Sequence, residues 1–116
     1  MRVELNDDNI SWMASANKVV IPGDFIDAIY DKKLNEIIAL DMGGVYLFSE
    51  RGLLVRSLSL KSSGYQVYCL ASEGSNTDSV IRVVIAHEPP FRGERFWQHD
   101  VNIENGMISD PITQWR

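Results

Sequence analysis

Residues 35–60 read NEIIALDMGGVYLFSERGLLVRSLSL, and this stretch decides the fold. It holds three runs rich in Val, Ile, Leu, Tyr and Phe, which are separated by the short segments MGG and ERG. Branched and aromatic side chains suit the pleated surface of a sheet, and glycine can supply the positive φ angles of tight turns. The stretch therefore predicts an antiparallel meander of three strands, with Gly43, Gly44 and Gly52 in its turns.

The rest of the chain predicts further short strands of the same kind. Pro89 and Pro90 end the most strand-like run, residues 80–87, and residues 88–94 are predicted to form a loop. Asn105-Gly106 is the strongest two-residue hairpin signal in the chain. The other predicted strands cover residues 2–5, 10–14, 18–21, 65–72 and 95–104, with the return strand beginning at 107–109 and residues 112–115 extending the sheet.

Residues 24–34 allow two interpretations. The spacing of Phe25, Ile26 and Ile29 favours one short helix, which Asp24 could cap. The alternation of Ile26, Ala28 and Tyr30 with two aspartates is equally compatible with a strand. We prefer the helix by a small margin, because the apolar residues fall near helical spacing.

A weak repeat relates residues 34–58 to residues 80–109, with Gly52 in the place of Gly106. Strand, turn, strand, glycine and strand recur in single blades of β-propellers, but a closed propeller needs about 4–8 blades. Two hairpins with glycine turns also look alike by chance, and we favour that explanation. The fold class is mostly β, with antiparallel meander sheets and at most one or two short helices; a true repeat would give two blade-like sheets packed face to face.

The predicted core consists of residues on the apolar face of each strand. These are Ile38, Leu40, Tyr46, Phe48, Leu54, Leu58, Val67, Cys69, Ile81, Val83, Ile85 and Trp97.

Length and composition predict a single domain over residues 1–116. A net charge of −5 argues against direct nucleic-acid binding. One cysteine, Cys69, excludes an intrachain disulfide and cysteine-rich zinc modules. The acidic N-terminus lacks a secretory pattern and no run is long enough to span a membrane, so we expect a cytoplasmic protein without a membrane partner.

Candidate catalytic groups are few. His87 and His99 each lie on the apolar face of a predicted strand, where a metal-binding or proton-transferring pair competes with a purely structural role, and the structural role is favoured. Cys69 lies on an apolar face and is expected to behave as a small hydrophobe. The sequence has no recognisable nucleophile, metal or phosphate motif. We therefore expect no enzymatic activity, no cofactor and no metal.

Two surface segments combine acids with aromatic residues, which commonly anchor protein interfaces. They are residues 7–12, DDNISW, and residues 88–97, EPPFRGERFW. The predicted partner contacts are Asp7, Asp8, Glu88, Phe91, Glu94 and Trp97. Trp97 belongs to the predicted core as well, because it could hold the second segment from beneath.

In its small size, acidity, β-rich pattern and absence of catalytic motifs, the chain resembles bacterial immunity proteins, the antidotes of contact-dependent inhibition and other polymorphic toxin systems. That resemblance implies a protein that neutralises a cognate toxin domain by occluding a basic active-site groove. One alternative is a small propeller-like module for ligand binding or sensing, and another is a small hydrolase or isomerase that uses His87 or His99. The oligomeric state stays open.

Overall fold

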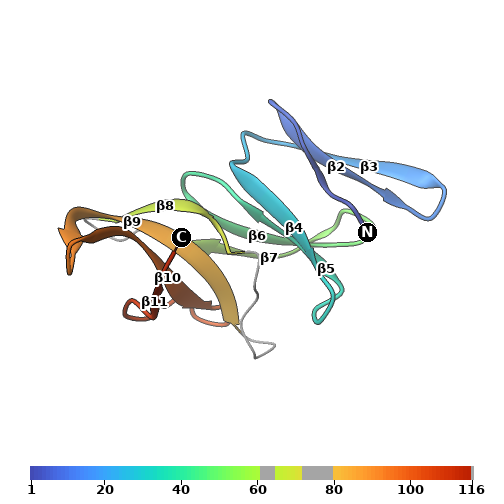
Figure 1. The fold of residues 1–116 in the computed structure, drawn as a ribbon. Coiled ribbons are helices and arrows are strands. Elements are labelled where there is room, and N and C mark those ends of the chain that lie inside the picture. Colours follow the sequence, from blue (N-terminus) through green and yellow to red (C-terminus); the bar gives the residue numbers. More distant parts are fainter. Residues whose placement is uncertain (61–64, 72–79, 116) are drawn as a thin grey trace. The chain divides into compact units, whose positions relative to one another are not determined.

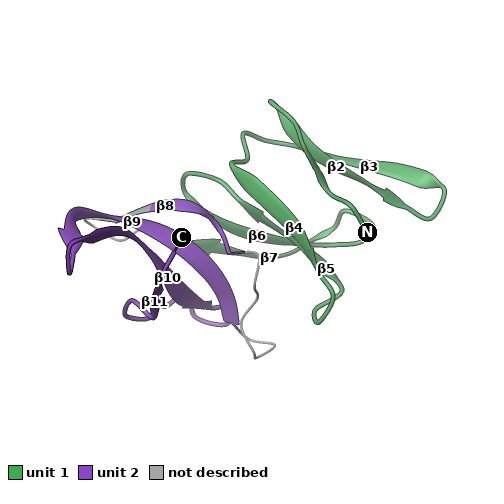
Figure 2. Cartoon of the chain, in the orientation of Figure 1, with its two compact units in different colours: residues 1–59 green, residues 60–116 purple. Residues whose placement is uncertain are grey.

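The computed structural model describes residues 1–60, 65–71 and 80–115. Every regular element in these segments is a strand, and every sheet is antiparallel, which confirms the predicted fold class (Figure 1). The chain divides into two compact units, Met1–Ser59 and Leu60–Arg116 (Figure 2). This division does not test the prediction of a single domain, which stays a prediction.

The first unit contains two sheets. One has three strands in the order β1-β2-β3, and the other has four in the order β4-β5-β6-β7. The strands are β1 (Glu4–Leu5), β2 (Asn9–Ala14), β3 (Asn17–Pro22), β4 (Asp27–Asp31), β5 (Glu36–Leu40), β6 (Gly44–Ser49) and β7 (Leu54–Ser59).

The second unit contains one four-stranded sheet in the order β11-β10-β9-β8. Its strands are β8 (Tyr65–Leu70), β9 (Val80–Phe91), β10 (Glu94–Asn102) and β11 (Thr113–Gln114). Residue 72, the end of the predicted strand 65–72, lies outside the described residues.

The core of the first unit forms where the three-stranded sheet packs on the four-stranded one. Ile10 and Trp12 from β2 cluster with Ile37 and Ala39 from β5 and Phe48 from β6. The Trp12 indole Nε1 donates a hydrogen bond of 2.7 Å to the backbone carbonyl oxygen that follows β6, at Glu50. A buried indole N–H needs such an acceptor, so this bond holds Trp12 in the core.

Residues 27–31 form strand β4, and the preferred helix of residues 24–34 is wrong. The strand pairs along its whole length with β5, from Asp27 opposite Leu40 to Asp31 opposite Glu36. Because the sheet supplies backbone partners for the whole segment, tertiary pairing outweighs the near-helical spacing of a short apolar run.

Gly43 and Gly44 do not use positive φ angles, contrary to the prediction, whereas Gly52 does, at φ 90°. Their turn is closed by the Asp41 carboxylate, which accepts hydrogen bonds from the backbone N–H groups of both glycines at 2.8 and 2.9 Å. Gly44 is required for another reason: a Cβ atom there would overlap the carbonyl oxygen of Leu58 on β7.

Leu54 is the one predicted core residue that lies on the surface, with 55% of its area exposed. β6 and β7 shift register where Leu47 faces Arg56 but Phe48 faces Leu54, so Val55 is an extra residue in β7. Such a bulge breaks the alternation from which burial was predicted. The buried predictions are Ile38, Leu40, Phe48, Ile81, Val83, Ile85 and Trp97, and the half-buried ones are Tyr46, Leu58, Val67 and Cys69.

The turn at Asn105-Gly106 is longer than the predicted two-residue hairpin. Asn102 N–H bonds the carbonyl of Met107 at 2.9 Å, which leaves four residues in the loop. A two-residue type I′ turn needs positive φ at both central residues, but only Gly106 has it, at 72°.

The two four-stranded sheets share one connectivity, a simple up-and-down meander. In these meanders β5 and β6 occupy the same central places as β9 and β10, as a true repeat of residues 34–58 and 80–109 would require. Gly52 and Gly106 both follow the third strand of their sheet and both have positive φ. The common connectivity is that of a blade-like sheet, while the face-to-face packing of two such sheets stays a prediction.

Burial predicts the cost of three truncations. Ile38→Ala and Ile85→Ala each remove a fully buried side chain and should lower the free energy of unfolding by about 2–5 kcal/mol. Leu54→Ala removes a mostly exposed one and should cost about 0.5 kcal/mol or less. Urea denaturation measures all three, and an equal cost for Leu54→Ala and Ile38→Ala would contradict the register of β7.

The neighbouring glycines offer a matched pair. Gly44→Ala should destabilise the protein clearly, because the new methyl group meets backbone atoms of β7. Gly43→Ala should be nearly neutral, since its nearest neighbour would be the Asp41 carboxylate oxygen at 3.7 Å. Thermal unfolding of both variants tests the close approach, and similar melting temperatures would argue against it.

Candidate functional site

The candidate site is built on the hairpin of β9 and β10, the longest strands of the protein. Direct pairs include Ile81 with Val101, Val83 with His99, and Ile85 with Trp97. Directly opposed residues of an antiparallel pair lie on the same face of the sheet. This register therefore gathers histidine and tryptophan side chains among buried aliphatic ones.

Strand β9 continues through Pro89 and Pro90 to Phe91, so the prediction that these prolines end it is wrong. The pairing is irregular there: Phe96 faces Ala86, and Glu94 faces Phe91. Proline cannot donate a ladder hydrogen bond and is tolerated at such an irregularity. The prolines thus lie where β9 has more residues than the facing part of β10.

Trp97 holds the end of the hairpin together. Its indole Nε1 donates to the backbone carbonyl oxygens of Glu94, at 2.9 Å, and Phe91, at 3.2 Å. The Phe91 ring packs edge-on against the Trp97 ring with 5.2 Å between their centroids. Trp97 is 8% exposed, so it is a buried anchor beneath the segment, and Phe91 is the half-buried ring beside it.

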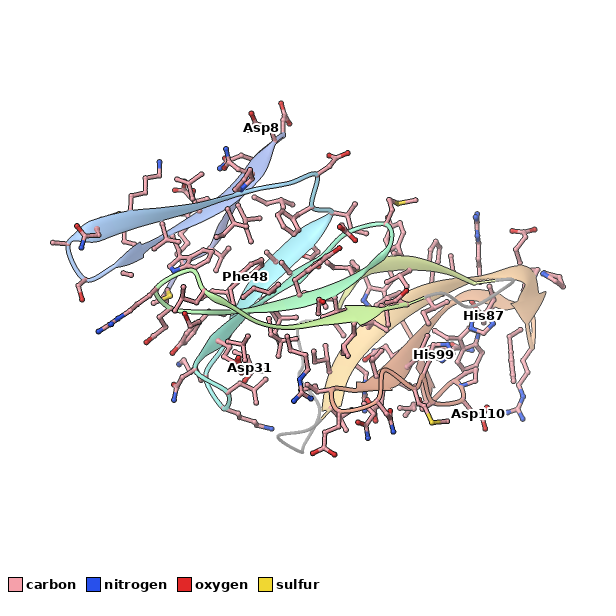
Figure 3. The ribbon with its side chains drawn as sticks, turned by 180° about the vertical axis from the view of Figure 1, so that it is seen from behind. Asp8, Asp31, Phe48, His87, His99 and Asp110 are labelled. Atoms are coloured by element: carbon pink, nitrogen blue, oxygen red, sulfur yellow. The ribbon has the colours of Figure 1, made fainter. Side chains whose placement is uncertain are left out.

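His87 and His99 form a buried hydrogen-bonded pair, with 2.9 Å between their Nε2 atoms (Figure 3). The His99 Nδ1 atom lies 2.8 Å from the carbonyl oxygen of Ser109, which can only accept, so Nδ1 carries the proton. With Nδ1–H donating to Ser109, the Nε2 atom of His99 can accept a hydrogen bond from His87 Nε2–H. The two hydrogen bonds therefore run from His87 to His99 and from His99 to the carbonyl oxygen of Ser109.

The environment keeps His87 neutral. Burial, and secondly the neighbouring His99, lower the pKa of His87 below its ordinary value of 6.5. A neutral imidazole can be buried beside another imidazole, whereas two charged ones would repel each other. The arrangement supports the structural role favoured for the two histidines, and His87, but not His99, lines a cavity.

A cavity of about 510 Å³ opens next to this pair. It is lined by His87, Phe91, Arg92 and Trp97 of the hairpin and by residues 110–112, which lead into β11. Its walls therefore combine two aromatic rings with a guanidinium group and, at Asp110, a carboxylate.

The structure brings four of the six predicted contact residues together. Glu88 and Glu94 are exposed at the end of the hairpin that contains Phe91 and Trp97. Glu88 also forms a surface ion pair of 3.8 Å with Arg95, which adds little stability because both side chains are solvated.

Asp7 and Asp8 belong to the other unit, in the exposed connection between β1 and β2. The Asp8 carboxylate accepts a hydrogen bond of 2.9 Å from the side chain of Asn9. The two aspartates are exposed and are not part of the hairpin.

Sequence reasoning missed the contribution of Arg92 and Asp110. Arg92 lies in the tight connection of the hairpin, with φ 50°, and its guanidinium carbon lies 5.1 Å from the Phe91 ring centroid. Asp110 follows Ser109, whose carbonyl holds His99. Arg92 lies within the segment 88–97 that the sequence had already singled out, whereas no pattern in the sequence marked Asp110.

The described residues offer neither a metal site nor a membrane-spanning helix. Across the described residues, no three His, Cys, Asp or Glu side chains gather in a way that could hold a metal ion. In the same part of the chain, no helix has the length and apolar character needed to cross a membrane. Neither a family model, nor a curated protein, nor a solved structure matches this chain.

The lowered pKa of His87 predicts a loss of stability in acid. The unfolded chain takes up a proton near pH 6.5, before the folded protein does, so His87 contributes its full stability above that pH. The contribution is lost as the pH falls through the lower pKa of the folded state. We expect the free energy of unfolding to fall more steeply between pH 7.5 and 5.5 in the wild type than in His87→Gln.

An NMR titration of the imidazole resonances checks the same point directly. The His87 ring should titrate with a midpoint below 6.5. A midpoint at or above that value, or equal pH slopes for the wild type and His87→Gln, would contradict the buried neutral state.

Proposed function

We propose that this chain is an immunity protein, which binds a cognate toxin domain stoichiometrically and covers its basic active-site groove. The observation that carries the proposal is the end of the β9–β10 hairpin, where exposed Glu88 and Glu94 accompany half-buried Phe91 over anchored Trp97. Aromatic residues held in place and surrounded by polar groups are the usual energetic centres of protein interfaces.

Rigidity supports this choice of surface. The Trp97 indole ties together both sides of the connection through its bonds to Phe91 and Glu94. A preorganised contact surface loses little conformational entropy on binding. The free energy of the hairpin's contacts can therefore contribute to affinity and specificity.

The net charge of the chain supports a basic partner, while the charges of the hairpin balance one another. The hairpin itself is balanced, because the carboxylates of Glu88 and Glu94 are matched by the guanidinium groups of Arg92 and Arg95. The long-range attraction to a basic groove therefore comes from the net charge of the whole chain, −5, whereas Glu88 and Glu94 act on the groove at close approach. The acids at the β1–β2 connection, Asp7 and Asp8, add to that field, while the hairpin supplies the close contacts.

The proposal places the protein in the cytoplasm, where it protects by binding and not by turnover. Co-expression tests it: the protein should rescue cells that express the toxic domain encoded by the adjacent gene, and the two should co-purify. If both proteins are folded but neither protection nor co-purification is seen, the proposal fails.

Substitutions in the hairpin should separate contact from attraction. Phe91→Ala should weaken binding by about 2 kcal/mol, roughly thirtyfold in Kd, mainly through faster dissociation. The double change Glu88→Gln and Glu94→Gln should slow association severalfold at low salt and much less at high salt. Stopped-flow association and surface-based dissociation measurements give the two rates.

Glu104→Gln is the matched control, because it removes the same charge beyond the opposite end of β10. It should change the association rate less than either hairpin acid does. An effect equal to that of Glu94→Gln would mean that the acids act only through total charge and that the hairpin is not the contact surface.

A further inference from the structure

The cavity beside the hairpin contains two opposite charges. Arg92 and Asp110 both line it, and both residues are exposed. Among the described residues no ion pair joins these two side chains; the Arg92 guanidinium lies over the Phe91 ring instead. Both charged residues thus line the same cavity, and they are not paired with each other.

The remaining lining carries no charge. The rings of Phe91 and Trp97 provide apolar surface, and Pro111 and Ile112 add aliphatic surface from the segment before β11. His87 is buried and bonded to His99, and its burial lowers its pKa below 6.5, which favours the neutral ring at pH 7. The cavity therefore suits a ligand with no net charge, one group of each sign and an apolar body.

We propose that this cavity binds a free α-amino acid with an apolar side chain. The α-carboxylate pairs with the Arg92 guanidinium, and the α-ammonium pairs with the Asp110 carboxylate. The side chain lies against Phe91 and Trp97. A volume of about 510 Å³ is ample for such a molecule and falls within the usual range of ligand sites, about 300–1,000 Å³.

This inference goes beyond partner binding and does not depend on it. Both proposals use Phe91 and Trp97, but the ligand depends on the charges of Arg92 and Asp110, whereas the interface depends on those of Glu88 and Glu94. Either can therefore fail while the other holds.

An NMR titration of the labelled full chain tests the site, with L-phenylalanine as the probe. The Trp97 indole N–H and the Ile112 amide should shift and saturate. N-acetyl-L-phenylalanine lacks the ammonium group and L-phenylalaninamide lacks the carboxylate, so each should bind at least about tenfold more weakly. Absence of saturable shifts at the lining residues, or equal affinities for the three compounds, would overturn the proposal.

Two substitutions assign the charges. Asp110→Asn should weaken L-phenylalanine binding about tenfold and remove the preference over the N-acetyl compound. Arg92→Gln should do the same for the preference over the amide. Glu104→Gln and Arg95→Gln change exposed charges outside the lining and should leave both preferences intact. If all four substitutions act alike while the amide spectrum stays that of the folded protein, the assignment is wrong.

Discussion

The antiparallel ladder between β9 and β10 is the constraint on which the candidate site depends. Its register puts Ile85 opposite Trp97 and Val83 opposite His99, all on one buried face. A shift of a single residue would turn both Trp97 and His99 to the other face of the sheet. The indole bonds that close the hairpin and the bond between the two histidines would then be lost together.

Local sequence was sufficient where residue type and tertiary environment agree. β-Branched residues and glycine turns predicted the β5–β7 meander and the start of β9, and the structure confirms them. Local sequence was insufficient where the pairing between strands determines the structure or the burial of a residue. Residues 27–31 become a strand because β5 offers partners along the whole segment, and Leu54 becomes exposed because Val55 forms a bulge.

The candidate site was predicted in part. The combination of acids and aromatic residues singled out the segment 88–97 as a contact surface but placed it in a loop, whereas the structure shows that it is the end of the β9–β10 hairpin. The histidine pair was considered but could not be derived, because His87 and His99 meet only through the register and irregularity of β9 and β10. The cavity depends on the path of residues 110–112, which no periodicity encodes.

The hairpin links these features to the proposed activity, since Trp97 holds the backbone at Phe91 and Glu94 by hydrogen bonds. Hydrogen–deuterium exchange of the chain, free and with the proposed toxin partner, tests that claim most directly. We expect backbone amides of residues 88–97 to exchange more slowly in the complex. Slower exchange confined to Met1–Ser59, with residues 88–97 unchanged, would contradict the assignment of the hairpin as the contact surface.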